Sequence, residues 1–202
     1  MVQLKANKVA REVKSIYKKT DAAMKSVSKV CQPGCAYCCL RSIRIHLAEE
    51  TVIGKYVNEE LSTETEEMIR KKLQRWFEFF NNVTPQRTLT ITDMLKLDKQ
   101  VAKSRMECPF LILSKCSIYP VRPLVCRTHS VNDSPDLCGA NPVRPGDPRG
   151  IKLQERGFKD LEKISGMNGF SLLTYATAEH FGIHGPFRGL DWSIIDASSM
   201  GK

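Results

Sequence analysis

Residues 31–39 read CQPGCAYCC, which places four of the eight cysteines of the chain within nine positions. Cys35 and Cys38 have the CxxC spacing with which one turn directs two sulfurs at a single metal ion. Pro33 presets φ and Gly34 tolerates positive φ, so this dipeptide supplies a bend that brings the first cysteine to the same side. The loop is therefore predicted to hold a metal.

A second group of cysteines lies in ECPFLILSKCSIYPVRPLVCRTHS and shortly after it. The short apolar run before Ser114 and Lys115 predicts a small hairpin over residues 109–119. Pro120 and Pro123 then bracket one irregular helical turn. Loops and hairpin ends suit thiolate ligands because their free backbone amides can hydrogen-bond sulfur. The candidate metal ligands of both groups are Cys31, Cys35, Cys38, Cys39, Cys108, Cys116, Cys126 and Cys138.

Three of these positions leave alternatives open. Cys39 follows Cys38 directly, and because adjacent side chains usually point apart, it is predicted to serve a second site or the far side of a cluster. Cys138 lies in a loop rich in proline, glycine and aspartate. There it either completes a site by folding back or stays unengaged. His129 follows Cys126 by three residues and is an alternative ligand at that end.

A disulfide framework is the main alternative for an even number of cysteines. It is not favoured, because the N-terminus lacks the apolar run of a secretory signal and cytoplasmic thiols stay reduced. A chain of 202 residues can also bury a core without covalent links. We therefore expect free thiols and a cytoplasmic protein.

The motifs CQPGCAYCC, HLAEETVI, CPFL and PVRPLVCR, taken together, resemble the CxxCxxCC or YkgJ-like family of zinc- or iron-chelating cysteine-cluster proteins. The resemblance covers residues 31–130 approximately, and it includes seven cysteines with Arg122, Pro123 and Arg127. The gap between the first two cysteines is one residue longer than the family label. The same module resembles part of flagellin lysine N-methylase, which implies an enzyme module linked to protein lysine methylation as an alternative function.

Sites made of four thiolates suit tetrahedral Zn²⁺ or an iron–sulfur cluster. Structural zinc typically uses two CxxC pairs, whereas this chain has one such pair and a second group with irregular spacing. That spacing suits an iron–sulfur cluster slightly better, because the corners of a [4Fe–4S] cube are widely separated. The predicted cofactor is an iron–sulfur cluster (4Fe-4S) or zinc, in one or two sites, with a structural or redox role.

Cys31, Cys35 and Cys38 also have the spacing with which radical S-adenosylmethionine enzymes hold a cluster. Those enzymes need a parallel βα barrel, and the alternating strand and helix patterns of such a barrel are missing here. Cys39 and the second cysteine group are foreign to that arrangement as well. This interpretation is not favoured.

The remaining sequence predicts helices. Apolar residues recur at helical spacing over 3–30. A further helix is expected after a capping box of Thr63 and Glu66, and another at 92–105 with Thr92 or Asp93 as its N-cap. The other expected helices lie at 48–60, 152–165 and 170–181. The helix after Thr63 is expected to bury Ile69, Leu73, Trp76, Phe77 and Phe80. His46 is placed on a strand end, and His180 and His184 are expected to be structural or solvent-facing, because Gly182 breaks the helix between them.

These patterns predict a mainly α fold with a small β-hairpin, in the form of a compact metal-centred domain with an N-terminal amphipathic helix. Residues 1–30 are expected to form that basic helix and residues 31–140 the cysteine-cluster domain. Residues 141–202 are expected to form a linker, C-terminal helices packed on the same body, and an irregular tail.

The net charge of +9 is concentrated in residues 1–30, which hold eight basic and two acidic side chains. The apolar face of this segment predicts packing on the body or on an unknown protein partner. Nucleic acid binding through the basic face is not favoured, because Tyr17 is its only aromatic residue. Arg122 and Arg127 are predicted either to offset thiolate charge or to bind an anionic cofactor or substrate. No apolar run is long enough to predict a membrane span.

Overall fold

The computed structural model describes residues 2–27, 30–31, 34–141, 144–166 and 168–184, with the side chains of residues 2–6 left aside. Its helices are α1 (Val2–Met24), α2 (Leu47–Glu60), α3 (Thr63–Val83), α4 (Ile91–Lys103), α5 (Leu124–Thr128), α6 (Asp136–Ala140), α7 (Pro148–Ser165) and α8 (Leu173–Ala178). Three short 3₁₀ turns are η1 (Tyr37–Cys39), η2 (Tyr119–Val121) and η3 (Glu179–Phe181).

Two small antiparallel sheets accompany these helices. One pairs β1 (Arg44–His46) with β4 (Phe170–Leu172), and the other is the hairpin of β2 (Leu111–Ile112) and β3 (Lys115–Cys116). The predicted fold class, mainly α with a small hairpin, is confirmed. Within the described residues, no helix combines the length and apolar character needed to cross a membrane.

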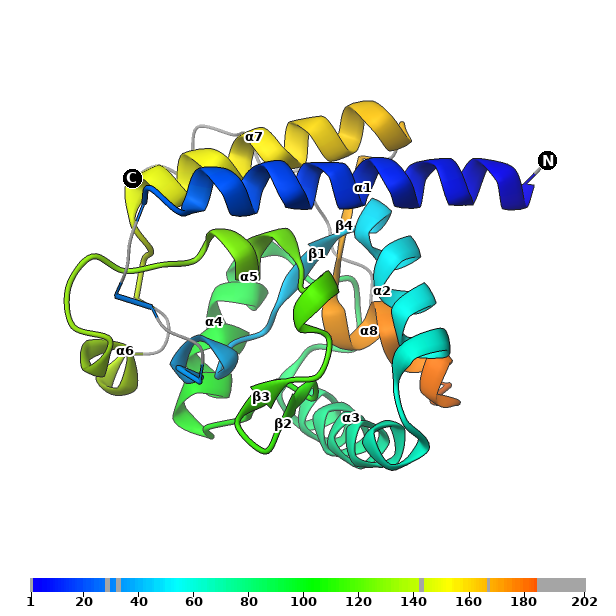
Figure 1. Cartoon of the computed structure of the whole chain (residues 1–202). Helices are drawn as coiled ribbons and strands as arrows, with labels where there is room; N and C mark the ends of the chain where they lie inside the picture. The colour runs from blue at the N-terminus through cyan, green and yellow to red at the C-terminus, as the bar shows by residue number, and fades with distance from the viewer. Residues whose placement is uncertain (1, 28–29, 32–33, 142–143, 167, 185–202) are drawn as a thin grey trace.

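The N-terminal helix α1 packs on the rest of the described chain through one face. Val9, Val13, Ile16 and Tyr17 are buried there, against α2, α5 and α7. Figure 1 shows α1 (blue) and α7 (yellow) side by side, with α5 below them. The predicted amphipathic helix is confirmed, although it ends at Met24 rather than at residue 30.

A second cluster of buried side chains joins α3, α4 and α8. Trp76 and Phe80 of α3 pack with Leu97 of α4 and Tyr175 of α8. The face predicted for α3 is found as expected, with Ile69, Leu73, Trp76 and Phe80 buried and Phe77 half-buried. This cluster lies beside the hairpin that carries Cys116, because α3 also contacts β2.

The predicted N-caps of two helices were each misplaced. The N-cap of α3 is Ser62 rather than Thr63, and its hydroxyl accepts from the backbone N–H of Thr65. The N-cap of α4 is Thr90, with Asp93 as the reciprocal partner three residues later. Each helix therefore begins earlier than predicted, because the capping oxygen belongs to the residue that precedes the first helical turn.

The C-terminal prediction also needs correction. Residues 170–172 form β4, in which Phe170 pairs with His46, and α8 begins only after that strand. Helical spacing of apolar residues cannot reveal this strand, because its partner β1 lies more than a hundred positions earlier. The helix predicted at 152–165 begins at Pro148, capped by Asp147, within the segment assigned to a linker. The tail after residue 184 lies outside the described residues.

Two glycines of α7 bring that helix unusually close to α5. A β-carbon at Gly150 would lie 2.3 Å from the carbonyl oxygen of Thr128, and one at Gly157 would lie 2.6 Å from the Leu124 side chain. Since the two glycines are seven residues apart, they share one face of α7. That face therefore fixes the position of the short helix that carries Cys126.

We predict that Gly150→Ala destabilises the protein by about 2 kcal/mol, because the added methyl group overlaps a backbone oxygen that cannot rotate away. Alanine in place of glycine inside a helix ordinarily stabilises a protein by about 0.5–1 kcal/mol. A loss of stability in this variant would therefore indicate the steric overlap. Urea denaturation followed by circular dichroism measures the change. Gly157→Ala should cost less, because its neighbour is a side chain. A stabilised Gly150→Ala variant would contradict the close packing of α5 on α7.

Candidate metal centre

The first cysteine segment follows α1 and turns sharply before it reaches β1. Gly34 has a φ of +91°, as the predicted bend requires, while Pro33 lies outside the described residues. The backbone then forms η1, where the N–H of Cys39 donates to the carbonyl of Ala36 at 2.9 Å. Leu40 is buried directly after it, so this turn is anchored to the core at its C-terminal end.

The second segment meets the first through the backbone. The N–H of Cys108 donates to the carbonyl oxygen of Cys39 at 2.7 Å. Cys116 lies opposite Leu111 on the hairpin, and Cys126 lies on α5, where its N–H donates to the carbonyl of Pro123. Three short elements, η1, the hairpin and α5, together with the loop at Cys108, therefore carry cysteines of the two segments to one region. All eight cysteines have free thiols.

Four cysteines form what we call the inner thiol group, which comprises Cys39, Cys108, Cys116 and Cys126. Burial raises the pKa of Cys108 to about 12, and the nearby thiol of Cys116 adds to the effect. Burial also raises the pKa of Cys126, with Cys38, Cys108 and Cys116 adding to it. Because charges act on one another mainly at short range, these effects indicate that the four thiols share one neighbourhood.

The neighbouring thiols of Cys38 and Cys39 hydrogen-bond to each other. This bond raises the pKa of Cys39 and is the largest cause that lowers the pKa of Cys38 to about 7. The guanidinium of Arg41 also lowers the pKa of Cys38. The two thiols therefore lie close together in the 3₁₀ turn, while the assignment of Cys39 to a second site or to the far side of a cluster stays a prediction.

The remaining cysteines form the outer thiol group, which comprises Cys31, Cys35 and Cys138. Burial raises the pKa of Cys31, and Cys35, Cys38 and Cys138 raise it further against a hydrogen bond from Val131. That backbone N–H lies 3.4 Å from the Cys31 sulfur. Cys31 is exposed as a residue, Cys35 is half-buried and Cys138 is buried, so this group reaches the surface at Cys31.

Cys138 is brought to the outer group by the short helix α6. The helix contacts η1, and a β-carbon at Gly139 would lie 3.0 Å from the ring of Tyr37. Arg144 approaches the Cys138 sulfur at 3.9 Å and pairs with Asp133. Of the two alternatives left open for Cys138, the structure favours the one in which the loop folds back.

The two predicted cofactor-binding arginines, Arg122 and Arg127, are engaged with α1. Both guanidinium groups bind the carboxylate of Asp21, and Arg127 also lies 4.0 Å above the ring of Tyr17. The pKa of Cys116 is raised by burial, and both arginines lower it in part. These contacts support the predicted offset of thiolate charge, while cofactor binding by either arginine stays a prediction.

The histidines contribute little to the thiol groups. Burial, followed by the charges of Arg41 and Arg144, lowers the pKa of His129 to about 4. His180 and His184 are exposed, and Gly182 ends the turn between them with a φ of +67°. Among the described residues, no three side chains of cysteine, histidine, aspartate or glutamate are already arranged to hold a metal ion. The sulfurs would have to rotate toward a shared ion when one binds.

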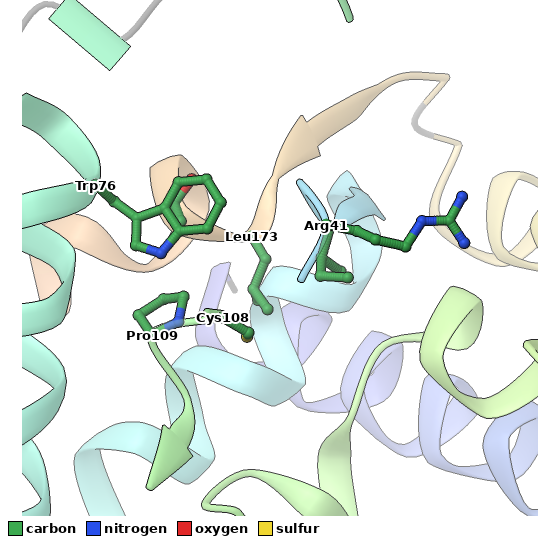
Figure 2. A pocket seen from close by; sticks show the side chains of 7 residues that line it. Arg41, Trp76, Cys108, Pro109 and Leu173 are labelled. Carbon is green, nitrogen blue, oxygen red and sulfur yellow. The ribbon is translucent and has the colours of Figure 1, made fainter. Parts of the chain in front are cut away.

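A small cavity adjoins the inner thiol group, and it is lined by Arg41, Ile43, Trp76, Cys108, Pro109, Leu173 and Thr174. The buried hydroxyl of Thr174 has no hydrogen-bond partner in the part of the chain that the structure describes. Figure 2 shows Trp76, Pro109 and Leu173 gathered near Cys108, while the Arg41 guanidinium extends away from them. The inner thiols thus have an apolar neighbourhood on this side.

Sequence reasoning missed the residue that holds the centre to the helices, Glu49. Its side chain is fully buried. One carboxylate oxygen accepts from the Tyr17 hydroxyl at 2.8 Å and from the N–H of Leu124 at 2.7 Å, and the other accepts from the N–H of His46 at 2.9 Å. Burial nevertheless raises the pKa of Glu49. The available signal was a glutamate three residues after a helix cap, which predicts only a local capping role.

Comparison with known families gives one match. A family model named CxxCxxCC and described as "Putative zinc- or iron-chelating domain" matches residues 30–143, which is more than half of the chain. The matched region contains all eight cysteines. No curated protein and no solved structure matches the chain.

We predict that Glu49→Gln lowers the free energy of unfolding by about 1–3 kcal/mol, because an amide cannot accept all three hydrogen bonds and leaves a buried donor unsatisfied. Urea denaturation of the metal-loaded protein measures the loss. Glu50→Gln is the matched control, since Glu50 lies next in the chain and its pKa is raised only by burial and Glu179. Equal stability of both variants and the wild type would show that Glu49 does not organise the centre.

Proposed function

Because the chain belongs to the CxxCxxCC family, we propose that it chelates zinc or iron through the thiols of its two cysteine segments. The observation that carries this proposal is the backbone hydrogen bond from Cys108 to Cys39, which joins segments far apart in sequence. Around that bond, thiols from a loop, a hairpin and a short helix lie near one another. No disulfide consumes any of them.

The donor set fits a soft transition metal. Thiolates select zinc, copper(I) and iron–sulfur clusters over magnesium or calcium. The proposed ligands are Cys31, Cys35, Cys38, Cys39, Cys108, Cys116, Cys126 and Cys138. Positive charge from Arg41, Arg122 and Arg127 lies beside them and offsets part of the thiolate charge. A bound zinc ion supplies cross-linking, whereas an iron–sulfur cluster supplies a redox couple as well.

Between these metals we favour the iron–sulfur cluster. Its support is the arrangement of the cysteines, which come from loops, a hairpin and short helical turns rather than from the paired CxxC turns of structural zinc sites. The role is then structural, redox or both. Function as an enzyme module beside lysine methylation, and a cytoplasmic location, stay predictions to which the described residues add no support.

Metal analysis of protein purified without oxygen tests this function. We expect zinc, or iron with inorganic sulfide and a brown colour, in the wild type. Cys38→Ser and Cys126→Ser should each bind less metal than the wild type, and Cys126→Ser should also lose stability, because ligand binding and folding are coupled where the ligand stands on packed backbone. The control is Val125→Ala, a change on the same short helix as Cys126. It leaves all eight thiols in place, so this variant should retain its metal. Full metal content in both serine variants would overturn the proposal.

The exposed face of α1 supports nucleic acid binding as a second candidate function. Lys8, Arg11, Lys14, Lys18 and Lys19 are exposed on the side opposite the buried face. None of them forms an ion pair with another described residue, whereas the acidic Asp21 is already neutralised by two arginines. A row of unpaired cations along a helix fits the evenly spaced phosphates of a nucleic acid.

For this second function we predict that binding of duplex DNA weakens as salt rises. Replacing Lys14 and Lys18 together by glutamine should reduce the slope of log K against log salt by about 1.8, because each lost phosphate contact removes about 0.9. Filter binding or fluorescence anisotropy measures the slope. The control replaces Lys55 and Lys71, two exposed lysines on α2 and α3 that are paired with glutamates. Binding that ignores salt would eliminate this function.

A further inference from the structure

The eight cysteines differ in how firmly the fold holds them. The inner thiol group stands on backbone that is fixed from several directions. Cys39 and Cys108 are joined by their backbone hydrogen bond, and Cys116 belongs to a paired strand. Cys126 lies on α5, which Glu49 holds at its first residue and the glycines of α7 hold along its side.

The outer thiol group stands at the periphery. Cys31 follows α1 and is exposed, and its sulfur accepts a hydrogen bond from the backbone of Val131. Cys138 sits on a helix of five residues that rests on the turn η1. Although Cys138 is buried, neither residue is part of a paired strand or of one of the long helices. The backbone that carries these two thiols is therefore less firmly anchored than that of the inner thiol group.

Cys38 connects the two groups. Its thiol lies near Cys31 and Cys138 of the outer group, and it also lies near all four thiols of the inner group. The CxxC spacing assigns Cys38 to the same ion as Cys35, because one turn carries both sulfurs. With Cys38 added, the outer group has four thiols, which equals the number in the inner group.

Four thiolates complete a tetrahedral site, so eight are enough for two. We propose that the chain holds two separate four-thiolate sites: an inner site at Cys39, Cys108, Cys116 and Cys126, and an outer site at Cys31, Cys35, Cys38 and Cys138, which reaches the surface at Cys31. The division rests on the proposed metal-chelating function. It follows that the outer site exchanges its metal readily, whereas the inner site holds the fold together.

The test uses the full-length protein reduced, stripped of metal and loaded with Zn²⁺ without oxygen. We expect two zinc ions for each wild-type chain. A variant with Cys31, Cys35 and Cys138 all replaced by serine should bind one zinc ion and keep the helical circular dichroism and thermal midpoint of the loaded wild type. Competition with a chelator should release zinc in a fast and a slow phase, of which the variant retains only the slow one.

A second measurement needs no variant. Wild-type protein loaded with zinc is treated briefly with chelator and then with a maleimide, and mass spectrometry locates the labelled cysteines. Labelling of Cys31, Cys35 and Cys138 before Cys108 and Cys126 supports the division. One zinc ion in the wild type, or loss of all zinc from the triple variant, would overturn the division and leave metal chelation intact. A wild type that binds no zinc and no iron would refute chelation itself.

Discussion

The buried carboxylate of Glu49 is the constraint on which the rest of the structure depends. It binds Tyr17 of α1, the first residue of α5 and the N-terminal end of α2 at once. A buried carboxylate is costly unless its oxygens are hydrogen-bonded, so these three elements must stay together. Arg127 reinforces the same junction, because it stacks on Tyr17 and pairs with Asp21. The N-terminal helix is thereby attached to the turn that carries Cys126.

This junction explains why the basic helix α1 packs against the second cysteine segment. The arginines beside the second cysteine group lie between Asp21 and the thiols, so each serves the packing of α1 and the electrostatics of Cys116 together. Beside α1, α7 also packs closely on α5, and it does so only because Gly150 and Gly157 lack side chains. The cysteine framework is thus held in place both by polar contacts with α1 and by close packing against α7.

Much of the site followed from local pattern. The bend at Gly34, the hairpin and the short helix at Cys126 are each encoded by a few neighbouring residues, so spacing and turn chemistry were sufficient to predict them. The proximity of the Cys38 and Cys39 thiols was not predicted, because adjacent side chains usually diverge, whereas this 3₁₀ turn brings them together. Strand β4 was missed, because three residues without their partner strand carry no distinctive pattern.

By itself, the sequence determined the helical class of the protein, the basic outer face of α1 and the concentration of thiols in two segments, because each depends on residues near one another along the chain. Only the tertiary structure decided that Cys39 meets Cys108, that α6, which carries Cys138, packs on η1, and that Glu49 lies at the centre. These are contacts between remote positions. They are stabilised by the burial of apolar faces and by the pairing of buried polar groups, and both effects arise only in the folded chain.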